Sequence, residues 1–204
     1  MSANYADATI SWNGNSITLL AFLKQQIDIC ENDTSRDDEL SLWLQMAGEA
    51  CEAYCDNVLA SCDTTEQHPA KISPVALRYY PVSALNAVTV DAVDVTDDYE
   101  VFESEGVDYI TSSTTGRTCP DGFKQMNIAY TAGYDPLPAD LAYAITRTAI
   151  NYDNTTFGTG VVKKESVVGV GSIEYATSDD TTGNVGAISS AAVATLDKYK
   201  RRYC

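Results

Sequence analysis

The chain has few basic residues and almost no histidine. Against 29 aspartates and glutamates, its 204 residues include 13 lysines and arginines and one histidine, which gives a net charge of −16. This excess of acids argues against a protein whose main task is to grip nucleic acid phosphates, because that task needs clustered cations. The acidity is also compatible with a simple need for solubility or with a halophilic source.

Long apolar runs are also missing. No window reaches the roughly eighteen apolar residues of a membrane span, and the N-terminal sequence MSANYADATISWNGNS lacks the basic start and apolar stretch of a signal peptide. We therefore expect a soluble protein that is made in a cytoplasm and has no contact with a membrane. The six cysteines are then expected to be reduced thiols and not a disulfide framework.

The sequence contains no motif for catalysis or cofactor binding. The single histidine, His68, lies in TEQHPAK, which we interpret as an exposed loop, and no nucleophile is placed beside it. The segment Gly169–Ser172 (GVGS) lacks the third glycine of a dinucleotide site, and there is no Walker sequence. Acid pairs such as Asp97-Asp98 fall in turns or helix starts. We expect no enzyme activity, no cofactor and no metal site.

Helical spacing is clear in the first third of the chain. It predicts a helix at 17–30 with Ser16 as N-cap, then a longer helix that opens after the cap Ser35 with acids in its first turn. The apolar stripe of the second helix runs from Leu40 to Cys62. Its cysteines are expected to pack as small apolar side chains and not to bind metal.

Residues 70–134 have the texture of β-structure, with turn signals about every ten residues. Two strands are predicted around a turn at Glu105-Gly106, and in a later strand the large apolar residues Met126, Ile128 and Tyr130 recur at every second position. Helical spacing returns from Ala139 to about Asn151, and a last helix is predicted at 188–202.

This order of elements predicts an α+β fold, namely a helical bundle core with an inserted small β-sheet and a β-hairpin before the C-terminal helix. The predicted helical core comprises residues 1–66 and 136–204, with the hairpin at about 161–175. The predicted β-rich insertion comprises residues 67–135.

A sharp change of period, from strand to helix, occurs within YTAGYDPLPADLAYAITRTA. Gly133 allows the backbone to leave the strand, and the two prolines disfavour helix before them while tolerating a helix start after them. Asp140 then lies in the first helical turn, where its charge suits the helix dipole. We call this stretch the elbow, and it consists of Gly133, Tyr134, Pro136, Pro138 and Asp140.

The C-terminal sequence KYKRRYC stands apart from the acidic remainder. It contains four cations, Lys198, Lys200, Arg201 and Arg202. Once their charge of +4 is set apart from −16, the other residues carry −20. Such an asymmetry suggests that this end of the protein meets a different surface from the rest.

Three stretches together resemble the head-to-tail connector, or adaptor, proteins of tailed bacteriophages. The first is the N-terminal pair of helices, ITLLAFLKQQIDICENDTSRDDELSLWLQMAGEACEAYCDNVL. The second is LRYYPVSALNAVTVD, with aromatic or basic residues, then Pro-Val, then a Val-rich strand. The third and most specific is the elbow, where a strand ends in AGYD and a helix begins at PADLAYAI.

The resemblance implies a structural virion protein of the neck, made in the host cytoplasm. Such a protein forms a homo-oligomeric ring, commonly of twelve copies, beneath the portal protein of a filled capsid. The ring extends the DNA channel and offers a platform to the next protein, a stopper or tail protein. Double-stranded DNA passes through it without specific binding, and an acidic wall would repel the phosphates.

In this family the C-terminal segment commonly reaches the portal. By analogy we expect a portal-docking segment that consists of Leu196, Lys198, Tyr199, Lys200, Arg201, Arg202 and Tyr203. Its cations would meet acidic groups of the portal. The alternative is that these cations serve only as favourable charge at a helix C-terminus and for solubility. The hairpin at 161–175 is a second candidate, for contacts between subunits or with the next neck protein.

Two other functions are compatible with the sequence. Another neck or tail-completion protein, a stopper or a terminator, would be mostly β, which the N-terminal helix pair argues against. A hydrolase or carbohydrate-binding protein would use the β-rich middle, and it would need carboxylates that converge in space.

Overall fold

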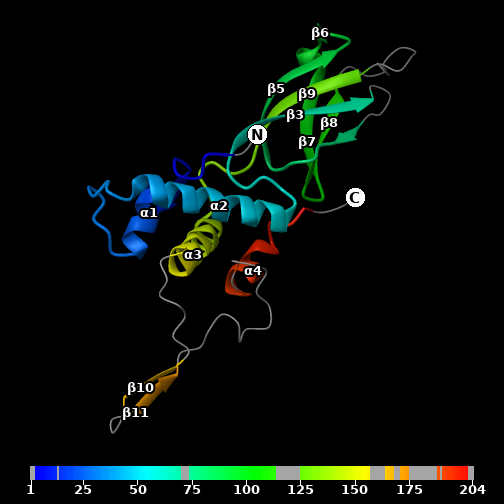
Figure 1. The fold of residues 1–204 in the computed structure, drawn as a ribbon. Helices are drawn as coiled ribbons and strands as arrows, with labels where there is room; N and C mark the ends of the chain where they lie inside the picture. The colour runs from blue at the N-terminus through cyan, green and yellow to red at the C-terminus, as the bar shows by residue number, and fades with distance from the viewer. Residues whose placement is uncertain are drawn as a thin grey trace. The chain divides into compact units, whose positions relative to one another are not determined.

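The computed structural model describes residues 3–12, 14–69, 74–113, 125–156, 164–167, 171–174, 188 and 190–201. The protein has an α+β fold and divides into two compact units (Figure 1). The helix unit contains Asn4–Cys55 and Pro136–Tyr199. The sheet unit contains Asp56–Asp135 together with short terminal pieces of the chain.

The helix unit holds all four α-helices of the described residues and two short antiparallel strand pairs. The helices are α1 (Leu19–Gln26), α2 (Asp37–Cys55), α3 (Ala139–Thr156) and α4 (Ser190–Leu196). The strand pairs are β1 (Thr9–Trp12) with β2 (Asn15–Thr18), and β10 (Lys164–Val167) with β11 (Gly171–Glu174). The second pair lies within the predicted hairpin, of which residues 161–163, 168–170 and 175 lie outside the described residues.

Helices α2 and α3 form the centre of the helix unit. Each buries one side at helical spacing, and the two sides meet where the Sγ atom of Cys51 lies 4.0 Å from the Oγ1 atom of Thr148. Leu44 and Ala47 of α2 and Ile145 of α3 are fully buried. The predicted stripe of α2 is confirmed from Leu40 to Cys55, and Cys51 and Cys55 are core residues.

The helix boundaries correct several predictions. α1 begins at Leu19 and not at residue 17, because Thr18 is its N-cap and Ser16 belongs to β2. The carbonyl of Arg36, not of Ser35, accepts the first backbone hydrogen bond of α2, from Leu40. The N-terminal β1–β2 pair was not predicted.

The end of α2 is another correction. The helix stops at Cys55 because Asp56 has a positive φ of 50°, outside the right-handed helical region. Cys62, predicted at the end of this helix, is instead the first residue of β3. Cys62 follows Val58 by four positions and so fits the helical spacing of the sequence, but the helix has already ended at Cys55.

A buried lysine organises the turn between α1 and α2. The Lys24 ammonium lies 2.5 Å from Asp37 Oδ1 and donates to the backbone carbonyls of Asp33 and Glu31 at 2.9 and 3.3 Å. The lysine is only 3% exposed. Burial of this charge is tolerable because the carboxylate and carbonyl oxygens replace the lost water.

Tyr5 fixes the N-terminal segment to α2. Its ring lies directly over Gly48, where a Cβ atom would sit 2.2 Å from the ring carbon Cδ2. The phenol donates to Glu52 Oε1 at 2.7 Å, and the side chain is fully buried. A glycine in the middle of a long helix usually weakens it, but here it creates the space that an aromatic ring fills.

The sheet unit consists of two small antiparallel sheets. The order of strands is β3-β9-β5-β6 in one sheet and β4-β8-β7 in the other. The elements are β3 (Cys62–Pro69), β4 (Val75–Ala76), β5 (Val82–Val90), β6 (Val93–Asp94), the 3-10 helix η1 (Thr96–Asp98), β7 (Tyr99–Ser104), β8 (Val107–Ser112) and β9 (Gln125–Ala132). The turn predicted at Glu105-Gly106 joins β7 to β8, and both of its residues have the positive φ that a type I′ turn requires.

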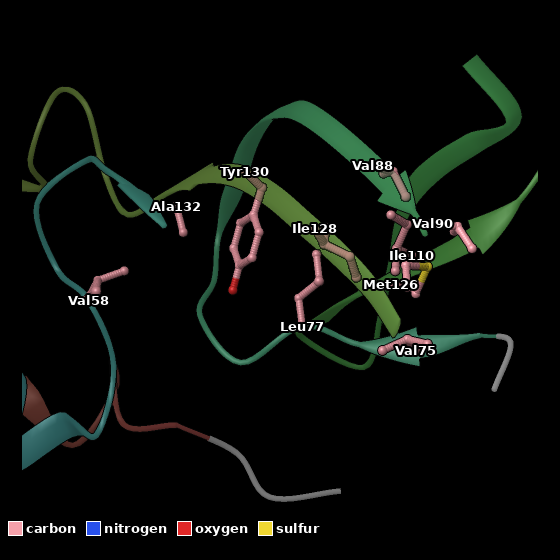
Figure 2. Packing of buried hydrophobic residues seen from close by; sticks show 10 residues of the cluster. All are labelled: Val58, Val75, Leu77, Val88, Val90, Ile110, Met126, Ile128, Tyr130 and Ala132. Atoms are coloured by element: carbon pink, nitrogen blue, oxygen red, sulfur yellow. The ribbon is translucent and has the colours of Figure 1, made fainter. Parts of the chain in front are cut away.

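The core of the sheet unit gathers side chains from both sheets. Met126, Ile128 and Tyr130 of β9 alternate inward as predicted. Figure 2 shows Leu77 beneath Ile128, and Ile110 of the second sheet beside Met126. The members of this cluster are Val58, Val75, Leu77, Val88, Val90, Ile110, Met126, Ile128, Tyr130 and Ala132.

His68 does not lie in an exposed loop, as predicted, but in β3. Long-range pairing with β9 makes TEQHP a strand and turns Glu66 and His68 to the same side. The imidazole Nε2 lies 2.7 Å from Glu66 Oε2. The same carboxylate accepts hydrogen bonds from the Tyr130 phenol and, at 2.9 Å, from the Arg78 backbone N–H. These bonds account for the presence of a polar cluster beside the core.

Candidate docking segment and strand-to-helix elbow

Gly133 leaves β9 with a left-handed backbone and lies against another part of the chain. Its φ is +100°, and a Cβ atom at this position would lie 2.5 Å from the carbonyl oxygen of Ala60. Its N–H donates to the Pro81 carbonyl at 2.9 Å. Glycine is therefore required here for two independent reasons, the sign of φ and the close approach of a backbone.

Tyr134 continues this contact within the sheet unit. Its N–H donates to the Leu59 carbonyl at 2.9 Å, and its carbonyl accepts from Ser61 at 3.2 Å. The two bonds form a parallel bridge between Tyr134 and Ala60, the residue on which Gly133 packs. The chain is thus held on both sides of the bend immediately before it leaves the sheet unit.

In the helix unit, the two prolines enclose a buried residue. Pro138 directly precedes α3, and its carbonyl accepts the first bond of that helix from Ala142 at 2.9 Å. Leu137, between Pro136 and Pro138, is 2% exposed and donates its N–H to the Thr9 carbonyl at 2.7 Å. Leu137 was not named in the sequence prediction, because a single apolar residue between prolines carries no periodic signal.

Asp140, in the first turn of α3, binds two residues of the predicted docking segment. Its Oδ1 accepts a hydrogen bond from the Tyr199 phenol at 2.6 Å, and its Oδ2 lies 3.2 Å from the Lys198 ammonium. Lys198 and Tyr199 are 58 and 59 positions from Asp140 in the sequence. The elbow and the docking segment therefore meet in the helix unit, although they are far apart along the chain.

The pKa of Asp140 reflects these contacts. Partial burial by itself would raise the pKa, but the hydrogen bonds from Tyr199, Lys198 and the Leu141 N–H, together with the charge of Lys198, hold the pKa below its ordinary value. Asp140 is therefore a carboxylate at neutral pH and serves as an acceptor for both side chains.

The next residues of the segment are bound within the sheet unit. Arg201 Nη1 lies 3.4 Å from Asp56 Oδ2, and Arg78 Nη2 lies 3.7 Å from the other oxygen of the same carboxylate. The Tyr80 phenol donates to the Lys200 carbonyl at 3.2 Å. Asp56 was missed by the sequence prediction, since its distance along the chain from Arg201 gives no local signal.

The structure corrects two features of the docking segment. Its helix, α4, is Ser190–Leu196 and not 188–202, because residues 197–199 form a turn. Leu196 was expected to supply apolar contact to a partner, but its side chain is fully buried in the helix unit. Arg202 and Tyr203 lie outside the described residues.

The charged pair of Lys198 with Asp140 lies at the surface. The Lys198 and Asp140 side chains are 67% and 42% exposed. Exposed pairs of this kind contribute less than about 1 kcal/mol each, because water screens them. The Arg201 side chain is less exposed, at 26%, beside an Asp56 side chain that is 42% exposed.

Side chains that bind metal ions do not gather in the described part of the chain. No group of three histidine, cysteine or acidic side chains there could hold a metal ion. Burial raises the pKa of Cys51 to about 12, so this thiol stays protonated and packs as an apolar group. Cys119 and Cys204 lie outside the described residues. Within the described residues, no helix has both the length and the apolar character to cross a membrane.

No family model and no curated protein sequence matches the chain. Solved structures do share its fold. A chain in the neck of an empty gene transfer agent (GTA) particle, with C6 symmetry, is 17% identical with a TM-score of 0.61, over 91% of this chain and 90% of that one. A chain in the virion of the native GTA particle is 15% identical, with a TM-score of 0.62 over 92% and 91%.

A third structure, the neck of the native GTA particle with C12 symmetry, contains a chain that is 14% identical. Its TM-score is 0.56, and the match covers 96% of each chain. All three matches extend over nine tenths or more of both chains and thus include both units. At such identities the likeness shows a shared fold.

Proposed function

We propose that this protein is a structural component of a virion neck, a head-to-tail adaptor that forms a ring beneath the portal. The observation that carries the proposal is the fold, which is shared over nearly the whole chain with chains of GTA necks and virions. The adaptor-like stretches of the sequence point the same way independently. Twelve copies are the expected number, and C12 symmetry in one of the matched necks supports it.

The ring would extend the DNA channel and offer a platform to a stopper or tail protein. With a net charge of −16 per copy, its wall would repel the phosphates of passing DNA. Only charges within about 8 Å of the DNA act strongly at physiological salt. DNA would pass through without specific binding, because no release of counterions favours a complex.

The portal is the proposed partner of the C-terminal segment. Its cations Lys198, Lys200, Arg201 and Arg202 would meet acidic portal groups, with Tyr199 and Tyr203 beside them. The support is that Lys198 is held by an exposed pair with Asp140, which carboxylates of a partner could replace at little cost. Leu196, which is buried, takes no part in this revised surface.

The experiment is co-purification of the full chain with its portal. The assembly should be a ring on the portal by electron microscopy, and deletion of residues 197–204 should abolish binding. A matched control replaces Lys24, whose ammonium is buried, because loss of that cation should lower stability without a direct effect on docking. Undiminished binding of the truncated chain would overturn the docking segment but not the ring.

The alternatives make different predictions for the same preparation. A stopper or terminator would bind an assembled adaptor or a tail tube and not the bare portal. The helices α2 and α3 favour the adaptor over these mostly β proteins. A hydrolase or carbohydrate-binding protein would show turnover or saccharide binding, which a screen of purified protein detects.

A further inference from the structure

The paired helices α2 and α3 have two outer sides. Where they pack together, α2 presents Cys51 and α3 presents Thr148. Successive helical residues are rotated by about 100°, so Leu42 lies on the side of α2 opposite to Cys51. By the same geometry, Tyr143 lies well away from the Thr148 side of α3. The helix unit therefore offers two separate surfaces, one on each helix.

The outer side of α2 combines apolar and acidic residues. Leu42 is 58% exposed and Met46, one turn later, is 42% exposed. Exposed acids, Asp38 and Glu49, lie one turn to either side of them. We call Asp38, Leu42, Met46 and Glu49 the α2 face. Two large exposed apolar side chains in adjacent turns are a feature of contact surfaces.

The outer side of α3 has the complementary composition. Tyr143 is 54% exposed, and Arg147, one turn later, is also exposed. We call these two residues the α3 face. Tyrosine and arginine are the residue types, with tryptophan, that contribute most to protein interfaces, because they bury large apolar areas and keep a polar end.

We propose that the α2 face of one copy packs against the α3 face of the next copy in the ring. Tyr143 covers Met46 and Leu42, while Arg147 pairs with Glu49. Met46 and Glu49 are three positions apart on α2, and Tyr143 and Arg147 are four positions apart on α3. Either spacing separates two side chains on a helix by about 5–6 Å, so the two pairs can face each other. This inference rests on the proposed ring and names the surface that builds it.

The occupant is a second copy for two reasons. The α2 face carries negative charge and two aliphatic side chains, whereas the α3 face carries a positive charge and an aromatic ring. Both faces belong to the same chain. Leu42 and Tyr143 also lie on the sides of their helices away from the contact between α2 and α3, so one copy can bind a neighbour at each helix. A contact between two different faces is the head-to-tail type, which closes into a ring when the rotation between copies allows it.

Charge reversal tests the contact. Glu49→Arg or Arg147→Glu, each in the full chain co-expressed with its portal, should reduce the yield of closed rings about tenfold or more, because like charges then meet at every interface. The double variant should form rings again. An equimolar mixture of the two single variants should also form them, since their faces match in alternation. The control is Glu100→Arg, an equal change of charge at an exposed position of β7.

The measurement is the number of copies per portal by native mass spectrometry, with melting curves to show that each variant folds. If both single variants close rings as the wild type does, this interface is wrong, whereas the proposed neck function stands. Failure of the double variant and of the mixture to recover would also overturn the pairing of Glu49 with Arg147. A wild-type chain that never assembles with the portal would overturn the proposed function and this inference with it.

Discussion

The Tyr199 phenol donates a hydrogen bond of 2.6 Å to Asp140 Oδ1, which joins the end of the chain to the first turn of α3. Burial alone would raise the pKa of Asp140, but the bonds from Tyr199, Lys198 and the Leu141 N–H, together with the charge of Lys198, lower the pKa in the folded protein. A carboxyl group of this kind stabilises the fold above its unfolded pKa of about 3.9 and loses that contribution as the pH falls through the folded pKa.

Asp140→Asn is therefore expected to lower the Tm at pH 7, by no more than the few degrees that an exposed interaction supplies. The difference from the wild type should shrink as the pH is lowered below about 4. Tyr199→Phe should reproduce part of the loss, and the effects of the two substitutions should not add. Additive effects in thermal melts would show that the two side chains do not interact in solution.

Gly133→Ala is expected to be strongly destabilising. The new Cβ would meet the Ala60 carbonyl oxygen at 2.5 Å, in addition to the strain of a positive φ. Gly14 provides the matched control, because its φ is +80° and no atom lies within 4 Å of a Cβ built there. The Gly14→Ala variant should lose about 1 kcal/mol and the Gly133→Ala variant several times more, measured by urea unfolding. Equal losses would mean that the approach of Ala60 is unimportant.

Gly48→Ala should lower the stability, although a change from glycine to alanine inside a helix usually raises it. In an ordinary helix interior this substitution gains about 1 kcal/mol. Here the methyl group would collide with the Tyr5 ring, at 2.2 Å, and displace the N-terminal segment. In a chain that already carries Tyr5→Ala, the same substitution should become stabilising. Chemical denaturation of the wild type, the two single variants and the double variant measures the change in stability in both backgrounds.

Tyr130→Phe should destabilise the sheet unit. Its phenol accepts from the Tyr79 N–H at 3.2 Å and donates to the Glu66 carboxylate, and both would lose a partner. Burial and the neighbouring carboxylate raise the pKa of this phenol, so it remains a donor at any ordinary pH. The expected cost is about 1–3 kcal/mol, whereas Tyr143→Phe at an exposed position of α3 should cost less than about 0.5 kcal/mol.

The purified protein should not bind duplex DNA, even at about 50 mM salt, where electrostatic attraction is strongest. The reason is its charge of −16, since most of its surface repels phosphates. Fluorescence anisotropy with a labelled duplex provides the measurement. Binding that weakens steeply with added salt would show that the basic C-terminal residues grip phosphates and would contradict the proposed repelling channel.

Local patterns determined much of this fold. The apolar stripe of α2, the alternation along β9 and the turn at Glu105-Gly106 each depend on a few neighbouring residues, so the sequence alone predicts them. Gly133 and Pro138 likewise mark the elbow through backbone preferences that act within two or three residues. The α+β class follows from these elements and their order.

Tertiary structure decided what the individual side chains do. Cys62 and His68 depend on the pairing of β3 with β9, which overrides a helical and a loop interpretation of the same residues. Lys24 is buried because Asp37 and two carbonyls of the turn after α1 surround its ammonium once that turn has folded back. The contacts of Asp140 with Tyr199 and of Asp56 with Arg201 join residues more than fifty positions apart. No local period records such pairs, because they form only when the folded chain brings their elements together.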